Sequence, residues 1–173
     1  KQMLELTYKS AKEFYDLLNN IIDFSRFQVD RMAILAKKVN LRKLIKRAII
    51  MEKAAAAVKK LEVTLKYPKM VPDIFISDET RLERIILNLL GNAIKFTDNG
   101  RIEIKIKLAH KENDRNFIIQ IVVSDTGIGI AEDKQQLIYE KFYREHPANQ
   151  NKYSGAGLGL HIVKQIIEDL SGE

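Results

Sequence analysis

The sequence predicts an α+β fold in which helices cover a sheet, preceded by one long helix. Apolar residues first recur at helical spacing, then alternate with polar residues from about residue 61, and return to helical spacing near residue 79. A helical motif, a hairpin and a further helix together favour a layered sandwich. With 173 residues, 46% of them hydrophobic, the chain can bury a core and hold one domain with an appendage or two small domains.

Composition excludes several classes of site. The chain has no cysteine, which excludes disulfides, thiolate catalysis and cysteine-ligated metals. No apolar run approaches the roughly 20 residues that span a bilayer, and residues 1–10 lack the apolar core of a secretory signal. We therefore expect a cytoplasmic chain, with any membrane anchor in segments outside it.

Positive charge is concentrated between Lys37 and Lys69. This window holds eleven lysines and arginines against two acids, a net +9 within a chain total of +6. It could contact nucleic acid or an acidic protein, or it could be a solvated helix face. Aromatic residues are not interleaved with these charges, which argues against single-strand stacking, and we expect no nucleic-acid partner.

The first segment is predicted to be one long helix ending near residue 38. Its apolar or small residues step alternately by four and three positions, as in a coiled-coil or bundle seam: Leu4, Tyr8, Ala11, Tyr15, Leu18, Ile22, Ser25, Val29 and Met32. A lone helix cannot cover this stripe. We expect it to pair with a second copy of itself or with a helix outside this sequence, which divides the chain into residues 1–38 and 39–173.

The following segments alternate helices with strands. Asn40 can cap a helix over residues 41–60, whose inner side is expected to carry Leu44, Ile45, Ala48, Ile49 and the alanine run 54–57. Residues 61–67 and 74–77 are predicted to form a short strand pair around Pro68 and Pro72. Asp78 is the predicted N-cap of a helix to about residue 97. Residues 102–108 and 117–123 are predicted to form a hairpin, and residues 137–143 and 161–170 to be helical.

The stretch NLLGNAIKF, residues 88–96, places polar groups along one side of a helix. Asn88 and Asn92 are four residues apart and share a face, with Lys95 almost beneath them. The other side carries Leu87, Leu90, Ala93 and Ile94. Amide oxygens and an ammonium group suit a metal ion and phosphate oxygens, but the same pattern is common on a solvated helix face.

Two glycine clusters follow the predicted hairpin. After its second strand, Asp125 could accept a hydrogen bond from the exocyclic amine of a base, with Gly127 and Gly129 allowing close approach, or it could only close an Asx turn. A polar segment, HPANQNKYS, is typical of a lid. The glycines of SGAGLGL then precede a helix, where free backbone N–H groups can bind an anion.

Four motifs in this order, NLLGNAIKFT, DTGIGI, EKFYRE and GAGLGL, resemble the N, G1, F and G2 boxes of sensor histidine kinase catalytic domains. These domains belong to the superfamily of gyrase, heat-shock chaperone and mismatch-repair ATPases. The front of the chain is similar to the second helix of the family's dimerisation and phosphotransfer hairpin. The resemblance implies the two-layer α/β sandwich of the Bergerat type. It also implies that a C-terminal strand pair is missing, which would expose a sheet edge and the inner face of the last helix.

The resemblance also implies a role for each motif residue. Asn88, Asn92 and Lys95 are the expected catalytic residues, with Asn92 ligating Mg²⁺ and Lys95 contacting the phosphates of ATP. Asp125 is expected to contact the adenine amine, and Gly127 and Gly129 the base. Phosphate binding and lid anchoring are expected of Gly155, Gly157, Leu158, Gly159 and Phe142. Arg144, Lys152 and Tyr153 are further lid candidates that the motif does not fix.

Asn88 separates branches of this superfamily. The ATP-hydrolysing relatives carry a glutamate at this position, where it activates water, and an asparagine cannot act as a base. His110, in the predicted charged turn, His146 and His161 all lack the setting of a phosphoacceptor. The predicted function is therefore transfer of the γ-phosphoryl of Mg-ATP to a histidine outside this chain. The expected partners are a phosphoacceptor hairpin and a response-regulator receiver domain. The alternatives are a catalytically silent nucleotide-binding scaffold and, disfavoured by Asn88, a gyrase-like hydrolase.

Overall fold

The computed structural model describes residues 33–111, 117–144 and 156–173, together with nine residues from Met3 to Ile22. Those nine residues are helical, in agreement with the predicted first helix, and the rest of the predicted seam lies outside the described residues. The chain divides into two compact units, residues 34–129 and residues 1–33 with 130–173.

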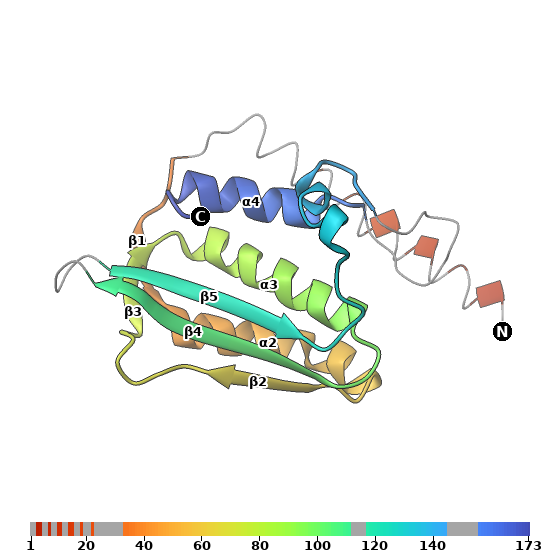
Figure 1. The fold of residues 1–173 in the computed structure, drawn as a ribbon, viewed down its shortest axis with the longest axis horizontal. Coiled ribbons are helices and arrows are strands. Elements are labelled where there is room, and N and C mark those ends of the chain that lie inside the picture. The colour runs from red at the N-terminus through yellow and green to blue at the C-terminus, as the bar shows by residue number, and fades with distance from the viewer. Residues whose placement is uncertain are drawn as a thin grey trace. The chain divides into compact units, whose positions relative to one another are not determined.

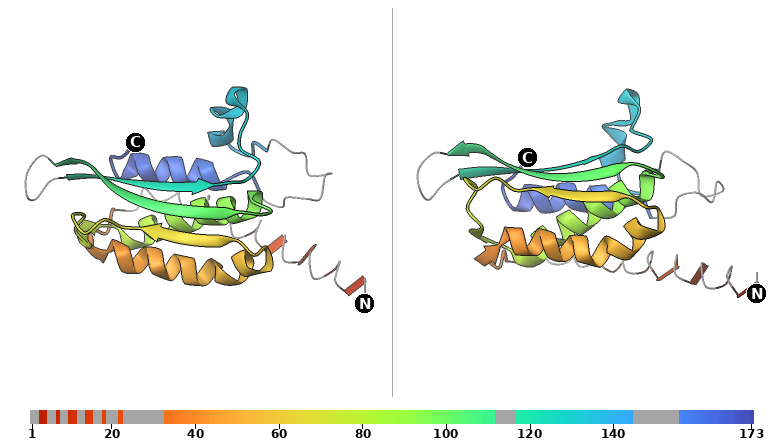
Figure 2. Two further views of the ribbon diagram at one scale, coloured as in Figure 1. Left: turned by 60° about the horizontal axis from the view of Figure 1, so that its bottom comes forward. Right: turned by 90° about the horizontal axis from the view of Figure 1, so that it is seen from below.

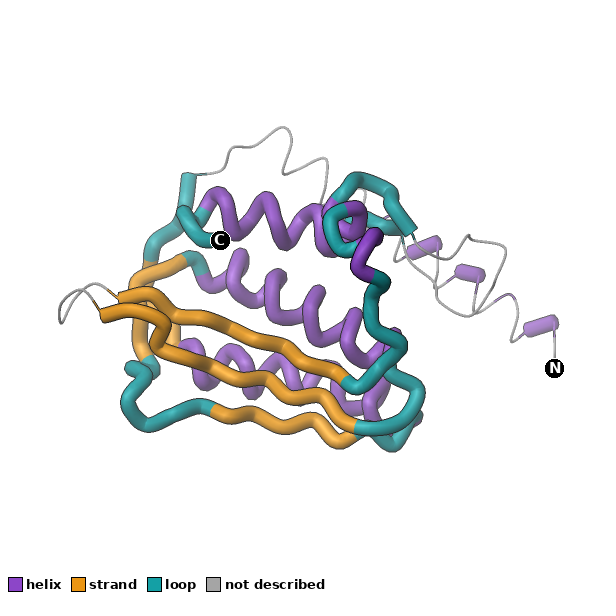
Figure 3. The backbone as a smooth tube through the Cα atoms, viewed as in Figure 1, coloured by secondary structure: helices purple, strands orange, loops and turns teal. Residues whose placement is uncertain are grey.

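Residues 34–129 form helices and strands in alternation (Figures 1 and 3). In chain order the elements are β1 (Lys37–Asn40), α2 (Leu41–Val58), β2 (Glu62–Lys66), β3 (Ile74–Ser77), α3 (Glu79–Phe96), β4 (Arg101–Lys111) and β5 (Phe117–Asp125). The predicted helices 41–60 and 78–97 and the predicted hairpin are confirmed to within a few residues. The residues that connect the hairpin, 112–116, lie outside the described part.

The strands form two separate sheets. A three-stranded sheet has the order β2-β4-β5, with β2 parallel and β5 antiparallel to β4, and a two-stranded sheet pairs β1 with β3. The predicted pairing of residues 61–67 with 74–77 is therefore wrong. Both strands form, but β3 pairs with residues 37–40, whose first two residues are a strand instead of the predicted end of the first helix. Val39, opposite Phe75, is buried and gives this short pair an apolar anchor.

The core lies between α2, α3 and the three-stranded sheet. Both helices cover the same face of that sheet (Figure 2), and alternate residues of the central strand β4 point into the core. The fully buried side chains include Leu44, Ile45, Ile86, Leu90, Ile102, Ile104 and Ile106. Each contributes about 1.5–3 kcal/mol on burial. The alanine run contributes less than predicted, because Ala56 alone of its four members is buried.

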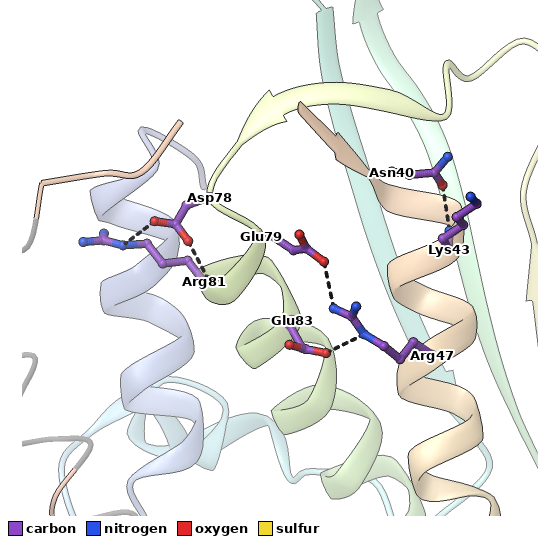
Figure 4. Close-up of polar contacts among 7 residues, drawn as sticks. All are labelled: Asn40, Lys43, Arg47, Asp78, Glu79, Arg81 and Glu83. Carbon is purple, nitrogen blue, oxygen red and sulfur yellow. Dashed lines mark hydrogen bonds and ion pairs between the residues drawn. The ribbon is translucent and has the colours of Figure 1, made fainter. Parts of the chain in front are cut away.

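Side chains cap both helices at their N-termini, as predicted. Asn40 Oδ1 accepts from the Lys43 N–H at 2.8 Å, and Asp78 Oδ1 accepts from the Arg81 N–H at 3.1 Å (Figure 4). The other oxygen of the buried Asp78 accepts from the Leu35 N–H at 3.0 Å. A single carboxylate therefore ties the start of α3 to the segment before β1.

Much of the basic window is engaged within the fold. Arg47 donates to Glu79 and Glu83, each at 2.9 Å, and so joins α2 to α3 (Figure 4). Arg42 pairs with Asp73, Lys59 with Asp98 and Lys66 with Glu103. Four of the eleven basic residues thus have internal acidic partners, which favours a structural and solvated role for the window.

The unit containing residues 130–173 has less regular structure. It comprises the short 3₁₀ helices η1 (Glu132–Lys134) and η2 (Leu137–Tyr139) and the helix α4 (Gly159–Asp169). α4 begins two residues before the predicted start, and η2 is shorter than the predicted helix. Ile162, Val163 and Ile166 of α4 are buried, so the expectation that its inner face is exposed is wrong. No helix in the described residues is long and apolar enough to cross a membrane.

Candidate functional site

The polar face of α3 is present as predicted. Asn88, Asn92 and Lys95 are half-buried, whereas Leu90, Ala93 and Ile94 belong to the core. Asn88 donates from Nδ2 to the carbonyl of Arg84 at 3.0 Å, so its amide group is partly used by the helix itself. Asn92 has no hydrogen bond from its side chain to any other described residue. Its carboxamide oxygen is therefore available as a ligand.

The loop after β5 adopts an Asx turn. Asp125 Oδ1 accepts from the Gly127 N–H at 2.8 Å, and the carboxylate is exposed. The turn leaves the second oxygen of Asp125 able to accept from another donor, because a carboxylate has about four acceptor sites. The two interpretations of this motif are therefore compatible: the carboxylate closes a turn and still presents an acceptor to a base.

Gly127 lies directly against the C-terminal end of α3. A Cβ at this residue would be 2.4 Å from the Phe96 carbonyl oxygen, a distance that real Cβ atoms do not show. The same oxygen accepts from the Ile128 N–H at 3.3 Å. Gly129 has φ +69°, which favours glycine, and open space around it. The structure thus brings the base loop, residues 125–129, together with the end of α3.

In the other unit, the F and G2 motifs meet. The Phe142 N–H donates to the Gly157 carbonyl at 3.0 Å. A Cβ on Gly157 would be 2.6 Å from the Tyr143 carbonyl oxygen, and its φ is +70°. This bond joins Phe142, the predicted lid anchor, to the second glycine of the G2 motif. The role of Phe142 as an anchor stays a prediction. The polar segment of the predicted lid, with Lys152 and Tyr153, lies outside the described residues, as does Gly155 of the G2 motif.

The N-terminus of α4 has the features expected of an anion site. The helix begins at Gly159, and neither a side-chain cap nor an acidic residue in its first turn competes for the backbone N–H groups. Leu158, its N-cap residue, is buried and its side chain holds the helix start in place. Free N–H groups and the positive end of the helix dipole favour a phosphate here.

Sequence reasoning missed two residues that shape the base loop. Thr126 Oγ1 accepts from the Arg101 N–H at 3.1 Å and so fixes the loop to the start of β4. Lys59 donates to backbone carbonyls at the end of α3. The turn residues DNG next to Arg101 are a local signal for the contact of Thr126. No local pattern indicated the contacts of Lys59. The predicted position of His110 is wrong, since it lies in β4 opposite Ile118 rather than in a turn.

Comparison with known proteins identifies the family. The family of histidine kinase-, DNA gyrase B- and HSP90-like ATPases matches residues 77–173, which is more than half of the chain. The chain belongs to this family. This match, together with the histidine kinase relatives and solved structures, confirms the resemblance to histidine kinase catalytic domains and the predicted sandwich fold.

Individual members of this ATPase family agree over nearly the whole chain. The signal transduction histidine-protein kinase BarA of Escherichia coli (strain K12) is 32% identical over 165 residues, covering 95% of this chain and 18% of BarA. The autoinducer 2 sensor kinase/phosphatase LuxQ of Vibrio vulnificus (strain YJ016) is 34% identical over 180 residues, covering 99% of this chain and 20% of LuxQ. The chain thus spans about a fifth of these relatives.

Solved structures of histidine kinases share the fold. Full-length ShkA in complex with AMPPNP matches with a TM-score of 0.79 and 26% identity, covering 98% of this chain and 34% of ShkA. The nucleotide-free catalytic domain of the histidine kinase ThkA matches with a TM-score of 0.64 and 25% identity, covering 80% of this chain and 82% of ThkA.

Proposed function

We propose that this chain binds Mg-ATP and transfers its γ-phosphoryl group to a histidine of a separate phosphoacceptor hairpin. One observation carries the proposal: the base loop is bonded to the end of α3 through Phe96 and Ile128. This contact joins the element that presents Asn88, Asn92 and Lys95 to the loop that presents the Asp125 carboxylate. A ligand with an amine-bearing base and a metal-bound polyphosphate uses both kinds of group.

Each residue has a defined chemical task in this proposal. Asp125 accepts a hydrogen bond from the exocyclic amine of adenine, and Gly127 and Gly129 allow the base to lie against the backbone. Lys95 contributes a positive charge to the phosphates. Backbone N–H groups at the start of α4 bind phosphate oxygens, with the loop formed by Gly155, Gly157, Leu158 and Gly159. Phe142 holds the base of the lid through Gly157.

The donor groups of the chain fit a magnesium ion that is shared with the nucleotide. Among the described residues, no group of three or more histidines or acids could hold a metal by itself. Mg²⁺ is usually bound by one or two protein ligands together with substrate phosphates and water, so the Asn92 carboxamide oxygen suffices. When bound, the ion neutralises phosphate charge.

The reaction needs no base from this chain. In the transfer, a nitrogen of the acceptor imidazole forms the new bond to the γ-phosphorus as the bond to the bridging oxygen breaks, and ADP leaves. The contribution of the chain is positioning and charge neutralisation, as is general for phosphoryl transfer. Asn88 cannot remove a proton from water, so hydrolysis is disfavoured.

The same proposal includes the partners. The first helix pairs with a second copy as part of the dimerisation and phosphotransfer hairpin, and the catalytic domain begins with β1 (Lys37–Asn40) rather than at residue 39. The phosphoryl group then passes from the hairpin to a response-regulator receiver domain. The names of the relatives, which are sensor and hybrid histidine kinases, support this assignment. We further propose that the chain acts on the cytoplasmic side.

Calorimetry tests the binding step. The unmodified chain is expected to bind Mg-ATP, and Asp125→Ala and Asn92→Ala are each expected to weaken binding at least about tenfold by removing a charged or metal-directed contact. The difference in ATP affinity between Asn92→Ala and the parent should become smaller when Mg²⁺ is left out. If both variants bind Mg-ATP like the parent, the assignment of the site is wrong.

Radiolabelled ATP tests the transfer step. Label is expected to move to a separate hairpin that carries an acceptor histidine, and Lys95→Met should slow this movement. Binding without any transfer would instead support the scaffold function. Release of inorganic phosphate without hairpin would support the hydrolase, and Asn88→Glu serves as the positive comparison for water activation.

A further inference from the structure

Lys59 follows the last residue of α2 and is distant from the motif residues in sequence, yet all three N–H donors of its ammonium group have acceptors at the end of α3. Its Nζ donates to the carbonyl oxygens of Ile94 at 2.9 Å, Lys95 at 2.7 Å and Thr97 at 3.1 Å. The side chain is 30% exposed and also lies 3.6 Å from Asp98 Oδ1. A lysine has three N–H donors, and here each one meets a backbone carbonyl.

These contacts complete the C-terminus of α3. The last four carbonyl groups of a helix have no partner within it, and in α3 they belong to residues 93–96. The Thr97 N–H satisfies Ala93, and the Ile128 N–H satisfies Phe96. Lys59 satisfies the two carbonyls between them. Lys59 and the base loop therefore cap the same turn of the same helix.

The capped turn is the one that connects the proposed ligand groups. It carries the Lys95 side chain, it follows Asn92 by less than one turn, and its last carbonyl holds the base loop. Figure 3 shows the ends of α2 and α3 and the loop after β5 at the same end of this unit. A positive charge here also offsets the negative end of the α3 dipole beside a site for phosphate.

We infer that Lys59 is a positioning residue for nucleotide binding, acting through the carbonyl oxygens of Ile94, Lys95 and Thr97. This inference rests on the proposed function. Lys59 itself does not contact ATP. It holds the end of α3 so that Asn92 and Lys95 keep their placement relative to the Asp125 loop.

The test compares Lys59→Met with Lys59→Arg and Lys60→Met. Methionine keeps most of the length of the side chain and removes all three donors, whereas arginine keeps the charge and supplies donors. Lys60 is the matched control, because it is the adjacent, exposed lysine and its removal changes the net charge equally. Mg-ATP dissociation constants are measured well below the melting temperature of each variant. We expect Lys59→Met to raise the constant about tenfold or more, as for residues that orient a metal ligand, Lys59→Arg to restore most of the affinity, and Lys60→Met to have no effect.

Two further measurements distinguish positioning of the nucleotide site by Lys59 from a general effect of Lys59 on stability. Ile45→Val, a mild cavity in the same helix, lowers stability without touching the end of α3, and is expected to leave the dissociation constant unchanged. Amide hydrogen exchange at Gly127 and Ile128 should become faster in Lys59→Met and stay unchanged in Lys60→Met. Parental affinity or unchanged exchange in a folded Lys59→Met variant overturns the inference. If the parent binds no Mg-ATP, the proposed function fails, and the exchange rates alone decide whether Lys59 positions the loop.

Discussion

Gly127→Ala is expected to damage the joint between α3 and the base loop. The new Cβ would be 2.4 Å from the Phe96 carbonyl oxygen and 2.8 Å from Asp125 Oδ1. Gly127 is not among the glycines with positive φ, so the effect arises from the clash alone. Relief requires the loop to move away, which breaks the Ile128 N–H bond to Phe96 and the Gly127 N–H bond to Asp125.

The size of the effect follows from these two hydrogen bonds. At about 0.5–1.5 kcal/mol each, their loss predicts that the free energy of unfolding falls by about 1–3 kcal/mol. Mg-ATP affinity should fall as well, because the displaced loop carries Asp125. Urea unfolding measures the first quantity and calorimetry the second.

The control is Gly91→Ala in α3. A Cβ at Gly91 meets no atom within 4 Å, and alanine is favoured over glycine inside a helix by about 0.5–1 kcal/mol. Gly91→Ala should therefore raise the free energy of unfolding. If Gly127→Ala is as stable as the parent and binds Mg-ATP equally well, the close packing of the loop on α3 does not exist in solution.

Three more predictions concern other parts of the same unit, residues 34–129. Lys60 has φ +55° at the C′ position of α2, where the Lys60 and Leu61 N–H groups donate to the carbonyls of Ala57 and Ala56. Glycine adopts a positive φ without strain, so Lys60→Gly should raise the free energy of unfolding in urea by about 0.5–1 kcal/mol. Asp78→Ala removes a helix cap and leaves the Leu35 N–H without its acceptor. The free energy of unfolding in urea should fall by about 2–4 kcal/mol. A fall of less than about 0.5 kcal/mol would contradict this prediction. Burial and the charge of Asp73 raise the pKa of Tyr67 from 10.0 to about 12. The folded chain therefore holds the phenol proton more tightly than the unfolded chain. The resulting stability is fully present below pH 10 and is lost as the pH rises toward 12. An ultraviolet titration should show a late tyrosine step that disappears in Tyr67→Phe.

Local signals predicted the helices and their caps well. Asn40 and Asp78 cap the helices that follow them, because an N-cap depends on a residue and the backbone three positions later. The alternation of buried and exposed side chains along β4 was predicted equally well, since a central strand covered on one face must alternate apolar with polar residues. Such features depend on short stretches of chain.

Long-range pairing could not be predicted in the same way. The strands β2 and β3 have the composition of a hairpin, but each finds a partner elsewhere, β4 and β1, across tens of residues. β1 begins with two lysines and carries little strand signal of its own. The contacts of Lys59 were hidden for the same reason, because a lysine in a basic window is indistinguishable in sequence from a solvated one.

The two ends of α3 show why the site can be sensitive to residues that touch no ligand. At its N-terminus, Asp78 bonds both the first turn and Leu35, and Arg47 bonds Glu79 and Glu83 from α2. At its C-terminus, all of the last four carbonyls have donors, two of them from Lys59. Between these fixed ends, the Asn92 amide is left without a partner among the described residues. The fold thus uses its hydrogen bonds to hold the helix and keeps the metal-directed group unengaged, so that binding need not first break an internal contact.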